Sequence, residues 1–394
     1  MEEIVLKEIG ILEVHCHAKY LYTLCKICKT KKSNVTIFTT KEIFSRLEKY
    51  LENTKEYTII LKDDIESIHA FLKRVEKICN EKIDILFVNT FQLTCFHLPK
   101  YFGFNPKSKM ILTVHTANAW LKPKLVFNIK QLARTIDTNL SSFIGHRLIL
   151  PKFDGINVIY SPIKDFVLKE TNYKKKIFTL PFNFYEEQIK IHKKQNKKIQ
   201  FVIPGQIEEH RRDYDVILDA FEQLFKKYNK TIDLRLLGYP VGMYGNRILN
   251  RCKKLKDKGY NITYYDSFVP EETYHNIMKT VDFILLPIKI KSRGMGIQPE
   301  YYGKTKGSAA VFEGIQYAKP MVVPKNFNMI KELNGSTLKY DNSKDLETTL
   351  TEYIKNRKKL EDLENEAYKN SKYFSLVSIQ KYFTIELLDK LENL

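Results

Sequence analysis

Cysteine is scarce in this 394-residue chain, and its six cysteines show no disulfide framework. Long apolar runs are also absent, since no stretch approaches the roughly 20 residues that a membrane-spanning helix needs. The first residues lack a signal-peptide pattern, and the sequence contains no internal repeat. These absences argue against a secreted, disulfide-stabilised or membrane-spanning protein, and they predict a cytoplasmic location.

Acidic residues are too few to balance the basic ones, and the net charge is +19. Residues 101–200 hold 18 Lys and Arg against 6 Asp and Glu, so they supply +12, and the other 294 residues supply only +7. This asymmetry favours an anionic partner, which could be a membrane surface, a phosphorylated acceptor or nucleic acid. The alternative is that the charge only confers solubility and marks a basic linker.

The length and the 43% hydrophobic content favour two domains. In the first half, short unalternating apolar runs are separated by helical patterns, which is typical of a parallel sheet buried on both faces. These runs lie at residues 9–14, 35–38, 57–60, 83–88, 109–115, 157–160 and 177–180. The pattern predicts an N-terminal Rossmann-like domain over residues 1–185.

Residues 186–198 are polar and rich in lysine, and we interpret them as a linker. A second alternating series then predicts a C-terminal Rossmann-like domain over residues 199–375. Its expected strands lie at residues 199–203, 232–237, 261–265, 282–286 and 321–323. Residues 376–394 form a charged helical tail that we expect to pack back on the N-terminal domain. Two doubly wound domains of this kind predict an α/β fold with a ligand between them.

Residues 307–324 have the pattern of a loop, a helix start, a helix and a buried strand. Open α/β sheets bind phosphates at such helix starts, so the backbone at Gly307 and Ser308 is a candidate phosphate site. Glu313 follows one and a half turns later, where it could accept hydrogen bonds from a ribose. A surface glutamate on an amphipathic helix is the alternative for Glu313.

Two arginines, Arg211 and Arg212, come just after the first strand of the second half. Arginine offers fixed donors to phosphate oxygens, which favours a diphosphate here over a solvated basic turn. Residues 288–306 contain glycines, cations and tyrosines, and this composition suits a segment that closes over a sugar phosphate. A plain surface loop is the other interpretation of residues 288–306.

Taken together, the second half resembles the GT-B glycosyltransferases of the large retaining family often called family 4. Gly205-Gln206-Ile207 followed by Arg211 is similar to the Gly-Arg-Leu signature with its downstream Lys, and Phe312-Glu313-Gly314 with Lys319-Pro320 is similar to the Leu-Glu-Ala and Gly-Lys-Pro pattern. Five fragments occur in the family's order. They lie at residues 205–211, 236–238, 264–272, 281–287 and 312–323.

The resemblance implies that a nucleotide-diphosphate sugar is the donor substrate and that no cofactor or metal is required. By position, it implies that Glu313 binds the ribose and that Arg211 contacts the diphosphate. The amides near Gly307 and Ser308 would then meet the phosphates. We also count Arg212 and Phe268, from the third fragment, among the donor-binding residues.

Two positions depart from the pattern of the resembled family. Gln206 replaces its first arginine, and Thr305 stands where a glutamate usually touches the donor sugar. We keep both as donor-binding candidates, and Lys304 or Lys306 could compensate at the phosphates. A solvated loop is the alternative for these lysines.

Three histidines are candidates in the first half. His115 ends a strand and is similar to the family's Thr-x-His turn, so we expect it to act in catalysis beside the donor sugar. His15 and His17 occupy the place of the family's first loop, where they could line the acceptor or donor pocket. The His15-Cys16-His17 triplet has no second ligand cluster, which argues against a metal site.

Residues 120–150 mix lysines and arginines with large apolar residues. A cationic amphipathic face of this kind could hold the protein on an anionic membrane, at the inner face, near a lipid-linked acceptor. Core helices with a solvated side are the alternative.

The sequence therefore predicts a hexosyltransferase-like enzyme that moves a sugar from a nucleotide-diphosphate sugar to a glycan or lipid-linked acceptor, with retention of configuration. Two alternatives stay open. The basic segment suits a glycosyltransferase that modifies DNA, although nucleic acid is the less favoured partner. Gln206 and Thr305 suit a noncatalytic GT-B-like binding protein.

Overall fold

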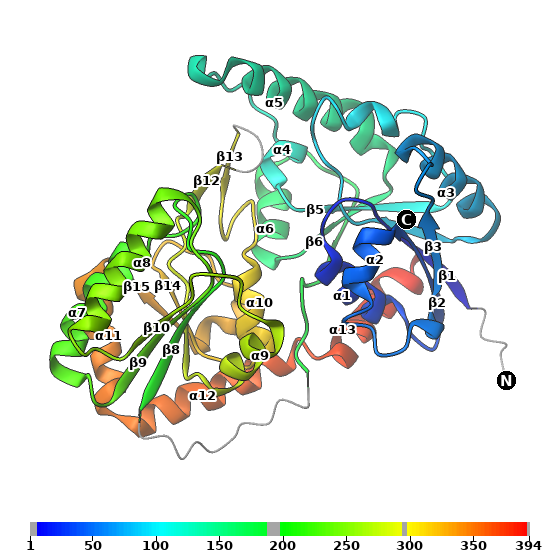
Figure 1. Ribbon diagram of the computed structural model, residues 1–394. Helices are drawn as coiled ribbons and strands as arrows, with labels where there is room; N and C mark the ends of the chain where they lie inside the picture. Colours follow the sequence, from blue (N-terminus) through cyan, green and yellow to red (C-terminus); the bar gives the residue numbers. More distant parts are fainter. Residues whose placement is uncertain (1–5, 187–197, 294–297, 392–394) are drawn as a thin grey trace.

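The protein is described from a computed structural model that covers residues 6–186, 198–293 and 298–391. The predicted α/β architecture is confirmed, because two domains are each built on a parallel sheet with helices on both sides (Figure 1). Most of the expected linker, residues 187–197, lies outside the described residues. None of the helices in the described ranges has the length and apolar content of a membrane span.

The N-terminal sheet has seven parallel strands in the order β3-β2-β1-β4-β5-β6-β7. Its strands are β1 (Lys7–Glu13), β2 (Ser33–Thr40), β3 (Thr58–Lys62), β4 (Ile85–Val88), β5 (Lys109–Val114), β6 (Gly155–Val158) and β7 (Lys176–Thr179). Its helices are α1 (Ala18–Cys28), α2 (Lys41–Leu47), α3 (Ile68–Lys82), α4 (Ala117–Leu121), α5 (Leu132–Ile144) and α6 (Ser161–Glu170). Every strand run that the sequence predicted for this domain is present.

The C-terminal sheet has six parallel strands in the order β10-β9-β8-β11-β14-β15. Its strands are β8 (Ile199–Pro204), β9 (Ile232–Leu237), β10 (Ile262–Tyr264), β11 (Phe283–Leu285), β14 (Met321–Pro324) and β15 (Thr337–Tyr340). Its helices are α7 (Tyr214–Tyr228), α8 (Gly242–Asp257), α9 (Glu271–Thr280) and α10 (Ala309–Gln316). The chain then continues through α11 (Ser343–Lys355) and α12 (Arg357–Lys372) to α13 (Leu376–Phe383), which lies in the predicted helical tail.

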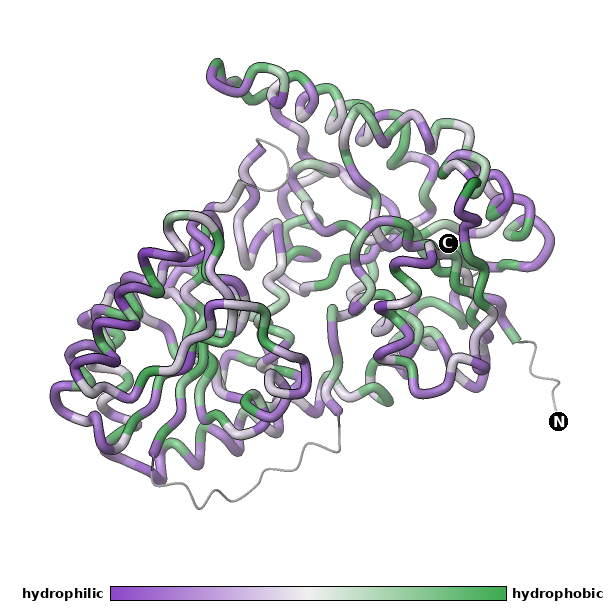
Figure 2. Tube along the Cα trace, viewed as in Figure 1, coloured by the Kyte–Doolittle hydropathy of each residue, from purple (hydrophilic) through white to green (hydrophobic). Residues whose placement is uncertain are grey.

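Burial explains why short apolar runs became strands. All six residues of β8 and all four of β4 are buried, as expected for strands covered by helices on both faces. Figure 2 shows the corresponding hydrophobic segments running through the middle of each domain, with hydrophilic residues along the outer helices. Helix starts are fixed by side-chain caps, for example Ser67 for α3 and Asn342 for α11.

Two features differ from the sequence-based expectation. The edge strand β15 was not predicted, since it is short and only its last residue is buried. The segment predicted as a closing loop instead contains an antiparallel hairpin of β12 (Lys291–Arg293) and β13 (Pro299–Tyr301). Residues 294–297 of that segment lie outside the described residues.

The two domains contact each other directly where the residues after β6 meet α10 and the loop before it. A side-chain carbon on Gly307 would approach the Ile159 side chain to 3.2 Å, so a larger residue there would have to displace Ile159 slightly. The ring of Phe312 packs edge-on against Tyr160 of the N-terminal domain. At the far end of the chain, α13 lies against α1, where the Gln380 amide donates to the carbonyls of Lys26 and Lys29. These contacts fix which surfaces face the junction between the domains.

Candidate functional site

The start of α10 lies at the domain junction. Ser308 is its N-cap residue, but no side chain caps the helix there. The first amides of a helix have no partner within the helix, and they carry a partial positive charge. The loop at Gly307 and the buried Ser308 therefore present backbone N–H groups to the junction, as the sequence suggested for an anion.

Glu313 lies on α10 and faces the N-terminal domain. Its Oε1 pairs with the Lys19 ammonium of α1 at 3.2 Å. Burial lowers the pKa of Lys19, but the Glu313 carboxylate more than offsets this and raises it overall. The other carboxylate oxygen, Oε2, is buried and has no hydrogen-bond partner among the described residues. Glu313 thus keeps one acceptor available inside the junction.

The two arginines after β8 differ in their surroundings. Arg211 is half exposed, and its guanidinium pairs with Glu208, whose carboxylate raises the pKa of Arg211. Arg212 turns inward, and its Nη1 is buried with no hydrogen-bond partner in the described part of the chain. Its Nη2 lies so close to Gly205 that a side-chain carbon there would be only 2.8 Å away. Of the two arginines, Arg212 is therefore the one with a buried N–H donor that has no hydrogen-bond acceptor in the described residues.

Tyr274 of α9 connects Arg212 and Glu313. Burial raises the pKa of the Tyr274 phenol well above its usual value, and the Glu313 carboxylate raises it further. Arg212 acts on the same phenol in the opposite direction, which requires both charged groups to lie near it. Arg212, whose Nη1 lacks a hydrogen-bond partner in the described residues, and Glu313, whose Oε2 lacks one, thus both act on the pKa of Tyr274.

Gln206 and Phe268 lie with Tyr239 at the carboxyl ends of β8, β9 and β10. The Gln206 side-chain amide donates to the Tyr239 hydroxyl. The Tyr239 and Phe268 ring centroids are 6.5 Å apart, and Phe268 is exposed. This cluster offers an open aromatic face beside amide and hydroxyl groups.

Thr305 is buried, and it lies between the β12–β13 hairpin and α10. Its hydroxyl accepts a hydrogen bond from the Tyr301 backbone N–H at 2.8 Å. Its carbonyl accepts from the Ala117 N–H of α4 at 2.9 Å, which links the two domains. The contacts of Thr305 are thus internal, and its contact with a donor sugar stays a prediction.

Glu300, on β13, was not singled out in the sequence. Its carboxyl group accepts from the backbone N–H of Ala119 at 3.1 Å and of Asn118 at 3.4 Å, so it caps α4 across the domain junction. Burial raises the pKa of Glu300 to about 7, against the opposing effects of the Thr305 hydroxyl and the two N–H groups. Near neutral pH the neutral and ionised forms of Glu300 are therefore both populated.

His115 and His17 stack on each other with ring centroids 4.6 Å apart. Burial lowers the pKa of His115 to about 3, and the charges of His17 and Lys306 act in the same direction. The His115 Nε2 lies 3.0 Å from the Asn89 carbonyl, which can only accept, so Nε2 carries the proton. His115 is therefore a neutral imidazole whose Nδ1 is a hydrogen-bond acceptor, and Lys306 lies near it.

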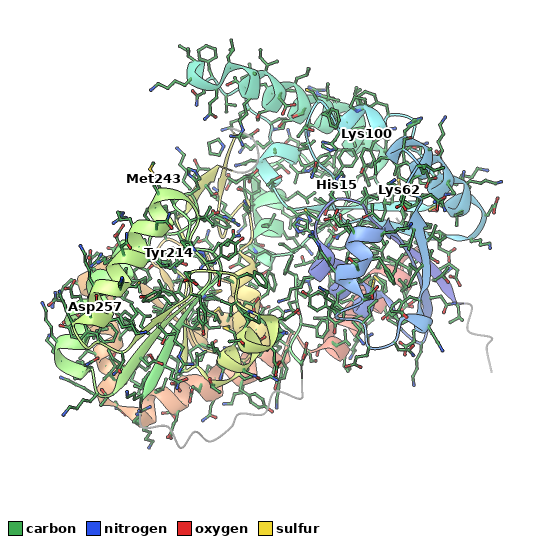
Figure 3. The ribbon with its side chains drawn as sticks, viewed as in Figure 1. His15, Lys62, Lys100, Tyr214, Met243 and Asp257 are labelled. Atoms are coloured by element: carbon green, nitrogen blue, oxygen red, sulfur yellow. The ribbon has the colours of Figure 1, made fainter. Side chains whose placement is uncertain are left out.

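His15 points away from this pair and toward another group. Its Nε2 lies 3.1 Å from the Tyr101 hydroxyl, and its ring packs edge-on against His97. Burial lowers the pKa of His15 to about 4, with His97 adding to the effect. Figure 3 places His15 near the middle of the molecule, on the N-terminal domain. His15 and His17 thus contact different groups, since His15 meets Tyr101 and His97 whereas His17 stacks on His115.

Glu13 holds the histidine loop in place and was missed in the sequence. Its buried carboxylate accepts from the His15 N–H at 2.7 Å and from the Asn89 side-chain amide at 2.7 Å. Because Asn89 also holds His115, one carboxylate positions both histidine-bearing loops. No group of three or more metal-ligating His, Cys, Asp or Glu side chains occurs in residues 6–186, 198–293 and 298–391.

The chain matches no protein-family model and no curated protein sequence. It is similar over nearly its whole length to several solved structures. HepE of Anabaena, in complex with UDP and glucose, is 13% identical, with a TM-score of 0.62, and the match covers 98% of this chain and 100% of that one. The UDP-forming α,α-trehalose-phosphate synthase of Burkholderia vietnamiensis is 8% identical, with a TM-score of 0.58 and coverages of 98% and 100%.

A third similar structure is that of MnaA from S. aureus with UDP, at 15% identity, a TM-score of 0.51 and coverages of 98% and 97%. The chain has the GT-B fold. Identities this low establish the arrangement of the two domains and nothing finer.

Proposed function

We propose that the protein is a glycosyltransferase that uses a nucleotide-diphosphate sugar. One observation carries this proposal: the buried Arg212 Nη1 and Glu313 Oε2 have no partner in the described residues, although both lie near Tyr274. An unpaired buried polar atom costs free energy, and such atoms persist where a ligand completes them. The GT-B fold supports the same location, since its ligands bind at carboxyl ends of parallel strands.

In this proposal the donor lies along the C-terminal face of the junction. Arg212 and the uncapped start of α10 hold the diphosphate, and Lys306 adds a cation beside it. Glu313 Oε2 accepts from the ribose hydroxyls, while Oε1 stays with Lys19. Phe268 packs on the base, with Gln206 near it. Arg211, already paired with Glu208, contributes charge from further out.

The chemistry follows from the charge that develops as the nucleoside diphosphate leaves. Fixed cations and oriented N–H groups stabilise that charge without reorganising, so they lower the barrier. The chain's own cations supply this stabilisation, and we propose that no metal is needed. The Nδ1 of neutral His115 accepts a hydrogen bond from a sugar hydroxyl, and this bond orients the sugar. Thr305 acts indirectly, by holding the hairpin that carries Glu300.

The acceptor, the stereochemistry and the location are finer parts of the proposal. We propose a glycan or lipid-linked acceptor beside His15 and His17, and retention of configuration, which rests on the resemblance of five fragments to family 4. A cytoplasmic site at the inner face of a membrane fits six free thiols, because disulfides do not persist in a reducing compartment.

The test is thermal unfolding of the full chain with UDP, GDP, ADP and their glucose, galactose and N-acetylglucosamine conjugates. A ligand that binds only the folded state raises the melting temperature, and ligand at about 100 times Kd adds about 2.7 kcal/mol of stability. The expected result is a rise with one nucleoside diphosphate that persists in EDTA. If no nucleotide raises the melting temperature, the proposed donor site is wrong.

Catalysis is tested separately by measuring nucleoside diphosphate released from the donor that binds best. Slow release into water, accelerated by glycan or lipid-linked acceptors, is the expected result. Tight binding without any release would instead identify a noncatalytic binding protein. Binding to duplex DNA that weakens steeply with salt would favour the DNA-modifying alternative.

A further inference from the structure

The segment before α5 and α5 itself carry large apolar side chains on the outside of the molecule. Leu125, Phe127 and Ile129 are 78%, 77% and 77% exposed. Leu132, Ile136 and Leu140 of α5 are at least half exposed as well. We call these six residues the α5 stripe. A folded protein rarely exposes contiguous apolar side chains on this scale unless they bind something.

The helix α5 buries its polar side and exposes its apolar side, which is the reverse of an ordinary surface helix. Its buried residues are small and polar, namely Thr135, Thr138, Ser141 and Ser142. At about 100° per residue, Leu132, Ile136 and Leu140 share an arc of roughly 80° on the opposite side. Surface helices normally bury their apolar side, so core packing does not explain this one. The apolar arc is therefore built for contact with something outside the chain.

The inner face of α5 is firmly attached to the domain. The Ser141 hydroxyl donates to the Leu93 carbonyl at 3.1 Å, and the Asp137 carboxylate accepts from the Cys95 N–H at 2.7 Å. The next residue, Phe96, is 74% exposed, with the Lys100 ammonium over its ring. Figure 1 shows α5 along an outer edge of the N-terminal domain, away from the six-stranded sheet. The orientation of α5 is thus fixed by specific contacts.

Positive charge surrounds the α5 stripe. Residues 122–152 contain six Lys and Arg and one Asp, and that Asp137 is directed inward. Lys124, Lys130 and Arg147 form no ion pair within the described part of the chain. Exposed apolar residues flanked by unpaired cations match an anionic bilayer, which offers both acyl chains and negative headgroups.

Other occupants match this surface less well. A second copy of the chain would bring two sets of cations together across the same apolar contact, and this repulsion disfavours pairing. Nucleic acid offers phosphates but no large apolar surface to cover six exposed Leu, Ile and Phe side chains. A bilayer satisfies the apolar residues and the cations at once.

We propose that the α5 stripe inserts into the surface of an anionic lipid bilayer, with the surrounding lysines and arginines on the headgroups. This inference deepens the proposed function by naming the element that contacts the membrane. Only the role of a lipid-linked acceptor rests on the proposed function. The Lys124 N–H reaches Gln298 at 3.5 Å, and the Gln298 amide donates to the Lys122 carbonyl at 3.0 Å. The bilayer contact therefore adjoins the hairpin at the domain junction.

The experiment is flotation of the full chain with vesicles of phosphatidylglycerol and phosphatidylcholine in equal parts, and with phosphatidylcholine alone. The variant Leu132→Ser/Ile136→Ser/Leu140→Ser removes apolar contact at exposed positions, so it should fold. We expect its partition into the anionic vesicles to fall by about 100-fold. The control, Ile65→Ser/Met243→Ser/Val377→Ser, changes apolar residues elsewhere that are even more exposed and should bind like the parent chain.

A second variant, Lys124→Gln/Lys130→Gln/Arg147→Gln, tests the charge. It should lose about 150-fold, because each of the three cations near the surface contributes roughly 1 kcal/mol, with Lys253→Gln/Lys339→Gln/Lys358→Gln as its control. Equal flotation of the α5 variant and the parent chain would overturn the inference. So would self-association that the α5 variant abolishes without any vesicle binding.

Nucleotide binding is measured on the same variants, because it separates this inference from the proposed function. The α5 variant should retain the melting-temperature response to the nucleoside diphosphate. A chain that floats with vesicles but binds no nucleotide would contradict the donor site and leave the bilayer contact supported.

Discussion

The two faces that meet at the domain junction differ in the charge state of their buried polar groups. The C-terminal face keeps charged groups whose polar atoms lack partners in the described residues, Arg212 Nη1 and Glu313 Oε2. The N-terminal face keeps these two histidines neutral, since burial holds the pKa of His115 near 3 and that of His15 near 4. Glu13 and Asn89 then satisfy the loops that carry these histidines.

This difference indicates a division of work. A face with unused charges is prepared for an anionic ligand before the ligand arrives, because those charges need no rearrangement to bind it. A neutral, hydrogen-bonded face suits sugar hydroxyls, which carry no charge. Substitutions on the C-terminal face should therefore change nucleotide affinity, and substitutions on the N-terminal face should change turnover.

The largest expected effect is that of Arg212→Met on nucleotide affinity. Methionine keeps much of the arginine's apolar length but removes the charged donor to the diphosphate. A hydrogen bond to a charged group contributes about 1.5–3 kcal/mol, so the Kd for UDP should rise by about 100-fold in titration calorimetry.

The matched control is Arg247→Met, because Arg247 is an exposed arginine of the same domain that pairs with Asp215. Its Kd for UDP should equal that of the parent chain. An unchanged Kd in the Arg212 variant would contradict the assignment of nucleotide binding to the C-terminal face.

Glu300→Gln tests the contact that joins the faces, through the pH dependence of stability. The folded pKa of Glu300 is about 7, above its usual 4.5, so the folded chain binds the extra proton between these values. Stability from this group is therefore complete below pH 4.5 and is lost as the pH rises through 7.

Glutamine stays neutral, so the variant does not lose this stability as the pH rises. Its free energy of unfolding relative to that of the parent chain should therefore increase by about 2 kcal/mol from pH 5 to pH 8. Denaturant unfolding at both pH values measures this difference. A constant difference across that range would show that Glu300 ionises freely and does not couple the domains through its neutral form.

Glu313→Gln addresses recognition of the ribose. The parent chain should bind UDP about tenfold more tightly than 2′-deoxy-UDP, since a carboxylate accepts from a hydroxyl more strongly than an amide does. In the variant this preference should shrink toward unity. Glu332→Gln, at an exposed glutamate of the same domain, is the control. A retained preference would place the ribose away from Glu313.

The smallest expected effect is that of His115→Asn, which should lower turnover by about fivefold, the worth of roughly one neutral hydrogen bond. The Kd for UDP should stay within about twofold of the parent value, because the imidazole is neutral and meets the sugar. His69→Asn changes an exposed histidine and should alter neither quantity. A rise in Kd without a change in turnover would reverse the division of work between the faces.

Local sequence determined most of the strands, the doubly wound class of both domains and the helical tail. A run such as residues 85–88 encodes burial directly, because a strand covered on both faces is apolar along its length. The same reasoning missed β15, whose residues are half exposed, and it missed the hairpin of β12 and β13, whose residues pair locally but dock on another domain.

Only the tertiary structure decided which candidates meet. Lys19 pairs with Glu313 across 294 residues of sequence, and Glu300 caps α4 from 181 residues away, so no local pattern could reveal either contact. The sequence named Arg211 and Arg212 alike, but Arg212 turns in beside Gly205 and has a buried Nη1, whereas Arg211 stays half exposed beside Glu208. Residue type fixes what a side chain can do, whereas burial and partners, which the fold sets, fix whether that capacity is still available.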